Sequence, residues 1–273
     1  MEIRSILVNV DLDTSSTSTL RYAIDLAHRF DAELIGLAAD QPSLTFAGVD
    51  GAATVADFYQ LERTEVEAQL AHAEAAFRGA VPATLKSQWR AYVNTPVAAL
   101  LELACLADVI VTGSTTNSTI RAVEKLDLGE LVLASGRPVL NVATSASEAK
   151  LDKVMIAWKD TREARRAVAD ALPFLKQAKE VLAVTIGEGD NRHERASLDD
   201  LVAWLGRHGV TARGDIIANP GKFVDILEST ALAQGVDLLV SGGYGHSRMR
   251  EWLFGGVTRN LLAANRLNRL LSN

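Results

Sequence analysis

The sequence predicts an α/β protein with two tandem five-stranded parallel sheets and helices on both faces. Short apolar runs rich in Val, Ile and Leu alternate with segments that repeat apolar residues at helical spacing. This alternation is typical of βαβ units. The order of strands and helices also occurs twice along the chain. Because crossovers between parallel strands are right-handed, such units place helices on both faces of the sheet.

In the first half, residues 3–10 form an apolar run that ends at the polar cluster 11–16, where helix N-cap residues are available. Residues 41–56 hold two Gly, one Pro and mixed small residues, and are predicted to be a loop or insertion. Further strands are predicted at 31–38, 87–93, 108–112 and 138–143, with helices at 19–30, at 58–77 and from Thr95-Pro96 onward.

In the second half, strands are predicted at 153–158, 180–186, 213–218 and 237–240, with helices at 163–177, 196–208 and 222–234. The last segment, 265–271, lacks the Pro-Val-Leu found at 138–140. We therefore expect the final strand to be frayed or differently paired.

The repeat divides the chain into two predicted domains, 1–146 and 147–273, joined by the small polar run 144–148. Residues 107–113 match residues 236–242 in kind. The first half carries about 19 extra residues between its first and fourth strands, which is consistent with an insertion near 41–56.

Composition limits the functional classes. The net charge of −6 argues against general nucleic-acid binding. The chain has no apolar run of membrane-spanning length and no signal-peptide layout at Met1, so no membrane association is expected. Cys105 is the only cysteine, so no intrachain disulfide can form, and it is predicted to be a buried, inert thiol. These features favour a cytoplasmic protein.

A glycine-rich segment follows the last strand of the repeat. Ser241 ends the strand, and Gly242, Gly243 and Gly245 follow it. A second pair, Gly255-Gly256, precedes a helical run. Glycines let the backbone approach a ligand, and the free N–H groups of a helix start favour an anion. The segment therefore predicts a phosphate-binding loop.

The spacing Gly242-x2-Gly245-x9-Gly255 resembles the signature G-x2-G-x9-G-(S/T) of the universal stress protein family. Gly256 stands where the family has Ser or Thr, and Thr258 offers a hydroxyl nearby. With the repeat, the resemblance covers nearly the whole chain. It implies two adenine nucleotide alpha-hydrolase-like domains that form a pseudo-dimer within one chain, and it leaves a further homodimer possible.

The resemblance implies a stress-response regulator whose second domain binds ATP or another adenine nucleotide, with Mg²⁺ as a possible companion. Nucleotide binding would order the 246–254 loop and change a surface that a protein partner recognises. Lys159 replaces the Asp with which the family usually ends its first strand, and is either a cation for phosphate or a solvated lysine. The predicted nucleotide-binding residues are Trp158, Lys159, Ser241, Gly242, Gly245, His246, Gly255, Gly256, Val257 and Thr258.

The corresponding loop of the first half departs from the motif. Gly113 is followed by Gly129 rather than by a glycine at the motif's spacing. Glu130 stands where the phosphate-contacting Ser or Thr would be, and its carboxylate would repel a phosphate. We therefore expect this first site to be lost.

Two other functions remain open. One is a slow nucleotide hydrolase or autophosphorylating enzyme that uses His246 or Lys159, since a histidine titrates near neutral pH. The other is a nucleotide-free interaction scaffold. The sequence has no P-loop, no Cys/His cluster for zinc and no H-E-x-x-H motif, so no metal ligand is assigned.

Overall fold

The structure is a computed structural model. It describes residues 2–12, 16–42, 52–113, 126–146, 148–187, 192–218, 223–243 and 266–273. Within these ranges, no helix is both long and apolar enough to cross a membrane.

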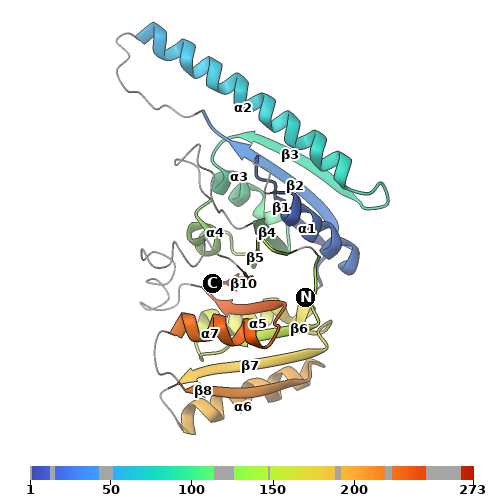
Figure 1. The fold of residues 1–273 in the computed structure, drawn as a ribbon, viewed down its shortest axis with the longest axis vertical. Helices are drawn as coiled ribbons and strands as arrows, with labels where there is room; N and C mark the ends of the chain where they lie inside the picture. Colours follow the sequence, from blue (N-terminus) through green and yellow to red (C-terminus); the bar gives the residue numbers. More distant parts are fainter. Residues whose placement is uncertain are drawn as a thin grey trace.

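Ten strands form one continuous sheet in the order β3-β2-β1-β4-β5-β10-β9-β6-β7-β8 (Figure 1). All neighbouring strands are parallel except β5 and β10, which are antiparallel. The strand order of the second half therefore repeats that of the first, with the antiparallel pair between them. The strands are β1 (Ser5–Asn9), β2 (Glu33–Asp40), β3 (Ser87–Val93), β4 (Val109–Gly113), β5 (Val139–Val142), β6 (Lys153–Ala157), β7 (Glu180–Gly187), β8 (Ala212–Ala218), β9 (Leu238–Gly242) and β10 (Asn268–Ser272).

Helices cover both faces, as predicted for parallel sheets. One face carries α1, α2, α5 and α6, whose apolar residues join a single buried cluster. On the other face, α3 and α4 pack in the first half and α7 in the second. The helices are α1 (Ser16–Phe30), α2 (Ala52–Ala80), α3 (Pro96–Leu103), the 3-10 turn η1 (Ala104–Leu106), α4 (Leu128–Ala134), α5 (Arg162–Leu175), α6 (Arg192–Arg207) and α7 (Phe223–Ala233).

The final strand differs from the prediction that it is frayed or differently paired, because it pairs with β9 as β5 pairs with β4. β10 is fully regular and lies in the centre of the sheet, paired with β9 on one side and β5 on the other. The strand contains a buried charged side chain. Arg269 is 1% exposed, and its guanidinium lies 3.3 Å from the carboxylate of Glu228 on α7. The ion pair lets an Arg-containing segment occupy the middle of a sheet, which the sequence pattern alone did not suggest.

Three further predictions are corrected. The segment 52–56, predicted as loop, is the start of α2, because its Ala-rich sequence contains no helix breaker. Helix α4 was not predicted; Asp127 begins it by accepting hydrogen bonds from two backbone N–H groups, at 2.9 and 3.0 Å. Cys105, predicted as buried, is exposed because α3 ends at Leu103 and the turn η1 turns the thiol outward.

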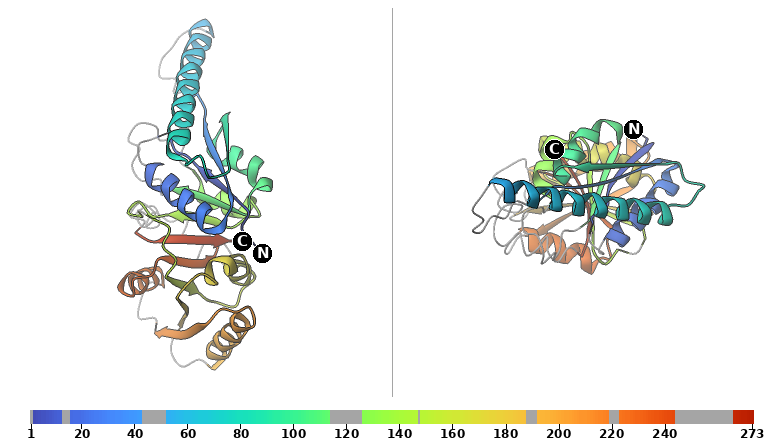
Figure 2. Two further views of the ribbon diagram at one scale, coloured as in Figure 1. Left: turned by 90° about the vertical axis from the view of Figure 1, so that its right-hand side faces the viewer. Right: turned by 90° about the horizontal axis from the view of Figure 1, so that it is seen from above.

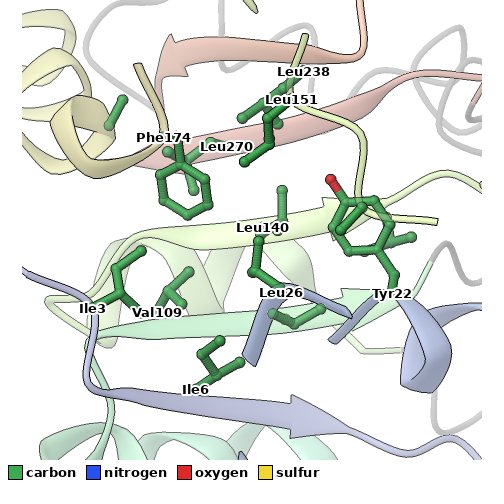
Figure 3. Close-up of a cluster of buried hydrophobic side chains, with 14 of the residues drawn as sticks. Ile3, Ile6, Tyr22, Leu26, Val109, Leu140, Leu151, Phe174, Leu238 and Leu270 are labelled. Atoms are coloured by element: carbon green, nitrogen blue, oxygen red, sulfur yellow. The ribbon is translucent and has the colours of Figure 1, made fainter. Parts of the chain in front are cut away.

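The buried core is continuous across the centre of the sheet. Phe30 at the end of α1 packs edge-on against Phe174 of α5, with ring centroids 5.3 Å apart. Leu140 of β5 and Leu270 of β10, cross-strand partners in the register, belong to the same cluster (Figure 3). The division at residues 146 and 147 remains a prediction, and the apolar packing crosses it.

Candidate functional site

The candidate site lies where β6 and β9 end side by side. Ala157, the last residue of β6, pairs with Ser241 near the end of β9. The chain leaves β6 through α5 toward β7, whereas β9 lies on the opposite side of β6. Such a reversal of strand order leaves a crevice at the carboxyl edge of an open parallel sheet, the usual place for a ligand. The predicted lysine and the first predicted glycine both lie at this edge.

Gly242 has a steric reason to be glycine. A Cβ atom placed on it would lie 2.6 Å from the backbone nitrogen of Ala164 and 2.6 Å from the carbonyl carbon of Glu163. Both atoms belong to the first turn of α5, so the helix start packs directly on the end of β9. The packing of α5 therefore explains why residue 242 is a glycine, without reference to a ligand.

Gly243 begins the predicted loop and is held from two directions. Its N–H donates to the carbonyl of Ser272 at 2.7 Å, and its own carbonyl accepts from the side-chain amide of Asn273 at 2.8 Å. A Cβ on Gly243 would lie 2.7 Å from Cγ1 of Val132 on α4. The start of the loop is therefore fixed both by the last strand and by a helix of the first half.

The start of α5 is already capped by protein groups. The hydroxyl of Thr161 accepts from the N–H of Ala164 at 3.3 Å. Burial acts to raise the pKa of Glu163, but hydrogen bonds from its own N–H and from Thr161, with the nearby Arg162, outweigh it and lower the pKa. The ionised Glu163 lies in the first turn of α5, where it complements the helix dipole. This helix start is consequently a poor anion site, and a phosphate would depend on the glycine loop itself.

Two predicted residues at this edge fit an anionic, hydrogen-bonding ligand. Lys159 is exposed and forms no ion pair within the part of the chain that the structure describes. The hydroxyl of Ser241 is buried and has no hydrogen-bond partner among the described residues. An unpaired cation and an orphaned hydroxyl are the kinds of groups that bind phosphate and ribose oxygens.

Trp158, also predicted at the site, faces elsewhere. The residue is 8% exposed and belongs to the buried cluster that also includes side chains of α5 and α6. Its indole N–H donates to the hydroxyl of Ser197 on α6 at 3.0 Å. The structure thus brings together Lys159, Ser241 and Gly242 at the sheet edge and turns the indole of Trp158 toward α6.

The rest of the predicted set lies outside the described residues: Gly245, His246, Gly255, Gly256, Val257 and Thr258. Across the described ranges, no cluster of three or more His, Cys, Asp or Glu side chains could hold a metal ion.

The first half has the same steric arrangement at its own strand ends. A Cβ on Gly113 would lie 2.5 Å from the hydroxyl oxygen of Thr19 on α1, in parallel with the contact of Gly242 with α5. The N–H groups at the start of α4 are bonded to Asp127, and Glu130 adds a second carboxylate in that turn. A phosphate bound at this turn would meet two carboxylates, which would repel it. This arrangement supports the prediction that the first site is lost.

Sequence reasoning missed Asn273 and Val132. Both contact the start of the glycine loop, yet they are 30 and 111 positions away from Gly243 in the chain. Neither belongs to a local motif, so only the pairing of β10 with β9 and the position of α4 bring them to the site.

The fold and the sheet edge define a class: a parallel α/β protein with a candidate ligand site at the reversal of strand order. Residues 2–126 match the model of the Usp, or universal stress protein, family. The match agrees with the family resemblance seen in the sequence, and it covers the N-terminal segment rather than the glycine motif of the second half.

Solved structures share the fold across the full chain. A universal stress protein from Archaeoglobus fulgidus DSM 4304 aligns with a TM-score of 0.67 at 18% identity, covering 98% of this chain and 96% of that one. A putative universal stress protein from Pseudomonas aeruginosa UCBPP-PA14 aligns with a TM-score of 0.59 at 17% identity, covering 99% and 93%. At these identities the likeness shows the fold.

A shorter relative has a reported ligand. A universal stress protein solved in complex with cAMP is 26% identical over 53% of this chain and 100% of its own, with a TM-score of 0.37. Among proteins with curated descriptions, none matches this chain.

Proposed function

We propose that the chain is a two-domain universal stress protein whose second domain binds ATP or a related adenine nucleotide as a stress-response regulator. The observation that carries the proposal is the glycine spacing beginning at Gly242, combined with the position of Gly242 where β9 and β6 end side by side. The family of residues 2–126 supports it. The repeated strand order and the central antiparallel pair support a pseudo-dimeric arrangement within one chain.

The steric role of Gly242 weakens the glycines as evidence of phosphate binding. Gly242 is required by the packing of α5 whether or not a nucleotide binds. The proposal therefore depends on Gly245 and Gly255, which complete the spacing, and on Lys159 and Ser241, whose polar groups are available at the edge. If Gly242 serves only to pack against α5 and no nucleotide binds, the favoured function is a nucleotide-free interaction scaffold.

Titration calorimetry of the full chain with ATP, ADP and AMP in Mg²⁺ buffer tests the proposal. Lys159→Glu reverses the exposed charge at the sheet edge and should weaken nucleotide affinity about tenfold. Lys176→Glu is the matched control, because Lys176 is an exposed lysine at the opposite end of α5. Gly245→Val should abolish binding, because it places a side chain where the loop must approach the phosphates.

If the unmodified chain shows no measurable affinity for any of the three nucleotides, the nucleotide-binding proposal is wrong and the scaffold function is favoured. If Lys159→Glu and Lys176→Glu reduce nucleotide affinity equally, the nucleotide does not bind at the sheet edge. Native mass spectrometry of the purified protein provides an independent measurement, since a bound nucleotide adds its mass to the intact chain.

A further inference from the structure

A cavity lies between α5 and α6, and neither Gly242 nor Gly243 lines it. Its volume is about 460 Å³, within the usual range of small-molecule sites. Two indoles, those of Trp158 and Trp204, line it together with apolar Val168 and Leu201. The remaining lining residues are Asp160, Arg165, His193, Ala196, Ser197, Asp200 and Arg207.

The aromatic walls are fixed by their own contacts. The N–H of Trp158 is bonded to Ser197, which sets the orientation of that ring. Trp204 packs against the imidazole of His208, with ring centroids 4.1 Å apart. Rings held in this way present flat surfaces at low entropic cost, and these favour a planar aromatic ligand.

Four charged side chains line the cavity apart from His193: two form an ion pair with each other, and two have no ion-pair partner among the described residues. Arg165 donates to the carboxylate of Asp160 at 2.6 Å, so each neutralises the other. Asp200 and Arg207 form no ion pair with any residue in the described ranges. The cavity therefore offers one carboxylate and one guanidinium for a ligand.

These two groups flank an indole on one helix face. Asp200, Trp204 and Arg207 are four and three residues apart, which places them on the same side of α6. At 1.5 Å per residue, Asp200 and Arg207 are separated by about 10 Å along the helix axis. A ring stacked on Trp204 would thus have an acceptor at one end and a guanidinium at the other.

We propose that this cavity binds a planar heteroaromatic acid, a ring that carries an N–H or hydroxyl group together with a carboxylate. The ring packs between the two indoles, the carboxylate meets Arg207, and the ring donor bonds to Asp200. Because Arg165 and Asp160 neutralise each other, Asp200 and Arg207 are the charged groups left for the ligand, and a molecule with both a ring donor and a carboxylate complements the two.

Indole-3-acetate is a suitable probe, because it combines a ring, an N–H and a carboxylate. Calorimetry with the full chain should give saturable one-to-one binding, with indole or acetate alone binding far more weakly. Arg207→Gln should weaken binding about tenfold, and Asp200→Asn severalfold. Arg195→Gln is the control: Arg195 is exposed on the same helix but does not line the cavity.

Lys159, Ser241 and Gly242 do not line the cavity, so the outcome of this test is distinguishable from that of the nucleotide test. ATP should not displace indole-3-acetate. The proposal is overturned if indole-3-acetate shows no saturable binding at millimolar concentration, or if indole alone binds equally well. Displacement by ATP, or an equal loss in Arg195→Gln and Arg207→Gln, would also overturn it.

Discussion

Gly242 and Gly113 end β9 and β4, and each lies against the helix that follows the adjacent strand. At Gly242 the obstructing atoms are backbone atoms of α5, whereas at Gly113 the nearest is the hydroxyl of Thr19. Backbone cannot move aside as a side chain can. The glycine of the second half is therefore the more constrained of the two.

Gly242→Ala should lower the free energy of unfolding by about 2 kcal/mol, because the new Cβ pushes α5 away from β9. Gly206→Ala is the control: Gly206 lies in the last turn of α6, and a Cβ there meets nothing within 4 Å. It should be neutral or stabilise by up to about 1 kcal/mol through reduced chain entropy. Urea unfolding of both variants measures the difference. A neutral Gly242→Ala would contradict the packing at the edge.

Tyr22 is a second constrained residue, at the junction of the two halves. Its side chain is fully buried in the central cluster (Figure 3), and its hydroxyl has no hydrogen-bond partner among the described residues. Burial, and to a lesser degree the nearby carboxylate of Asp237, raises the pKa of Tyr22. The neutral phenol is thus strongly preferred in the folded state.

Tyr22→Phe should stabilise the protein by about 1 kcal/mol at neutral pH, since it removes a buried, unsatisfied hydroxyl. The effect should grow above about pH 10, where the unfolded tyrosine ionises but the folded one does not. The raised pKa gives stability that is complete below the unfolded pKa and is lost as pH rises toward the folded value. Denaturant unfolding at neutral pH and near pH 11 checks both parts. A destabilised variant would show that the hydroxyl has a partner.

The position of Trp158 illustrates the limit of motif reasoning at this scale. Its place after β6 suggested contact with the nucleotide, because neighbouring Lys159 stands where the family usually has the Asp that ends this strand. The direction of a side chain beyond a strand end depends on what packs there. Here Ser197 of α6, which lies far along the chain, binds the indole.

Most of the elements could be predicted because apolar periodicity is local. β3 was predicted with its observed bounds, and most other strands within a few residues. α4 was missed because it has only seven residues and follows a segment without periodicity. β10 was misjudged because its pairing with β5 and the partner of its arginine lie far away in the chain. Contacts of this kind are set by tertiary structure.

Helix α2 extends beyond the sheet on which its second half packs, and it projects from the top of the molecule in the left view of Figure 2. Its buried side chains are Val66, Leu70, Ala73 and Phe77. Toward its start, Phe58 and Leu61 are 48% and 64% exposed. Packing therefore stabilises the second half of this helix.

Leu70→Ala should lower the free energy of unfolding by about 2–5 kcal/mol, because it leaves a cavity between α2 and the sheet. Leu61→Gln should change it by less than about 0.5 kcal/mol. Hydrogen exchange offers a second measurement, in which amides near Leu61 should exchange faster than those near Leu70. A large loss in Leu61→Gln would show that the exposed half is covered by another surface.

The molecule as a whole has a repeated topology but a shared core. Strand order repeats about the β5–β10 pair, yet the cluster that includes Phe30, Phe174, Leu140 and Leu270 crosses that boundary without interruption. Two domains with separate cores would unfold independently. A common core couples their unfolding, because neither half can lose its structure without exposing apolar surface of the other.

We therefore expect a single unfolding transition in calorimetry, with equal calorimetric and van't Hoff enthalpies. Phe174→Ala should shift this transition as a unit, at a cost of about 3–5 kcal/mol, and reduce hydrogen-exchange protection in β1 and β4 as well as in β6. Leu133→Ala is the control, because Leu133 is 50% exposed on α4 and its truncation leaves no buried cavity. Two resolved transitions, or loss of protection confined to residues 148–273, would show that the halves fold separately despite the contact between α1 and α5.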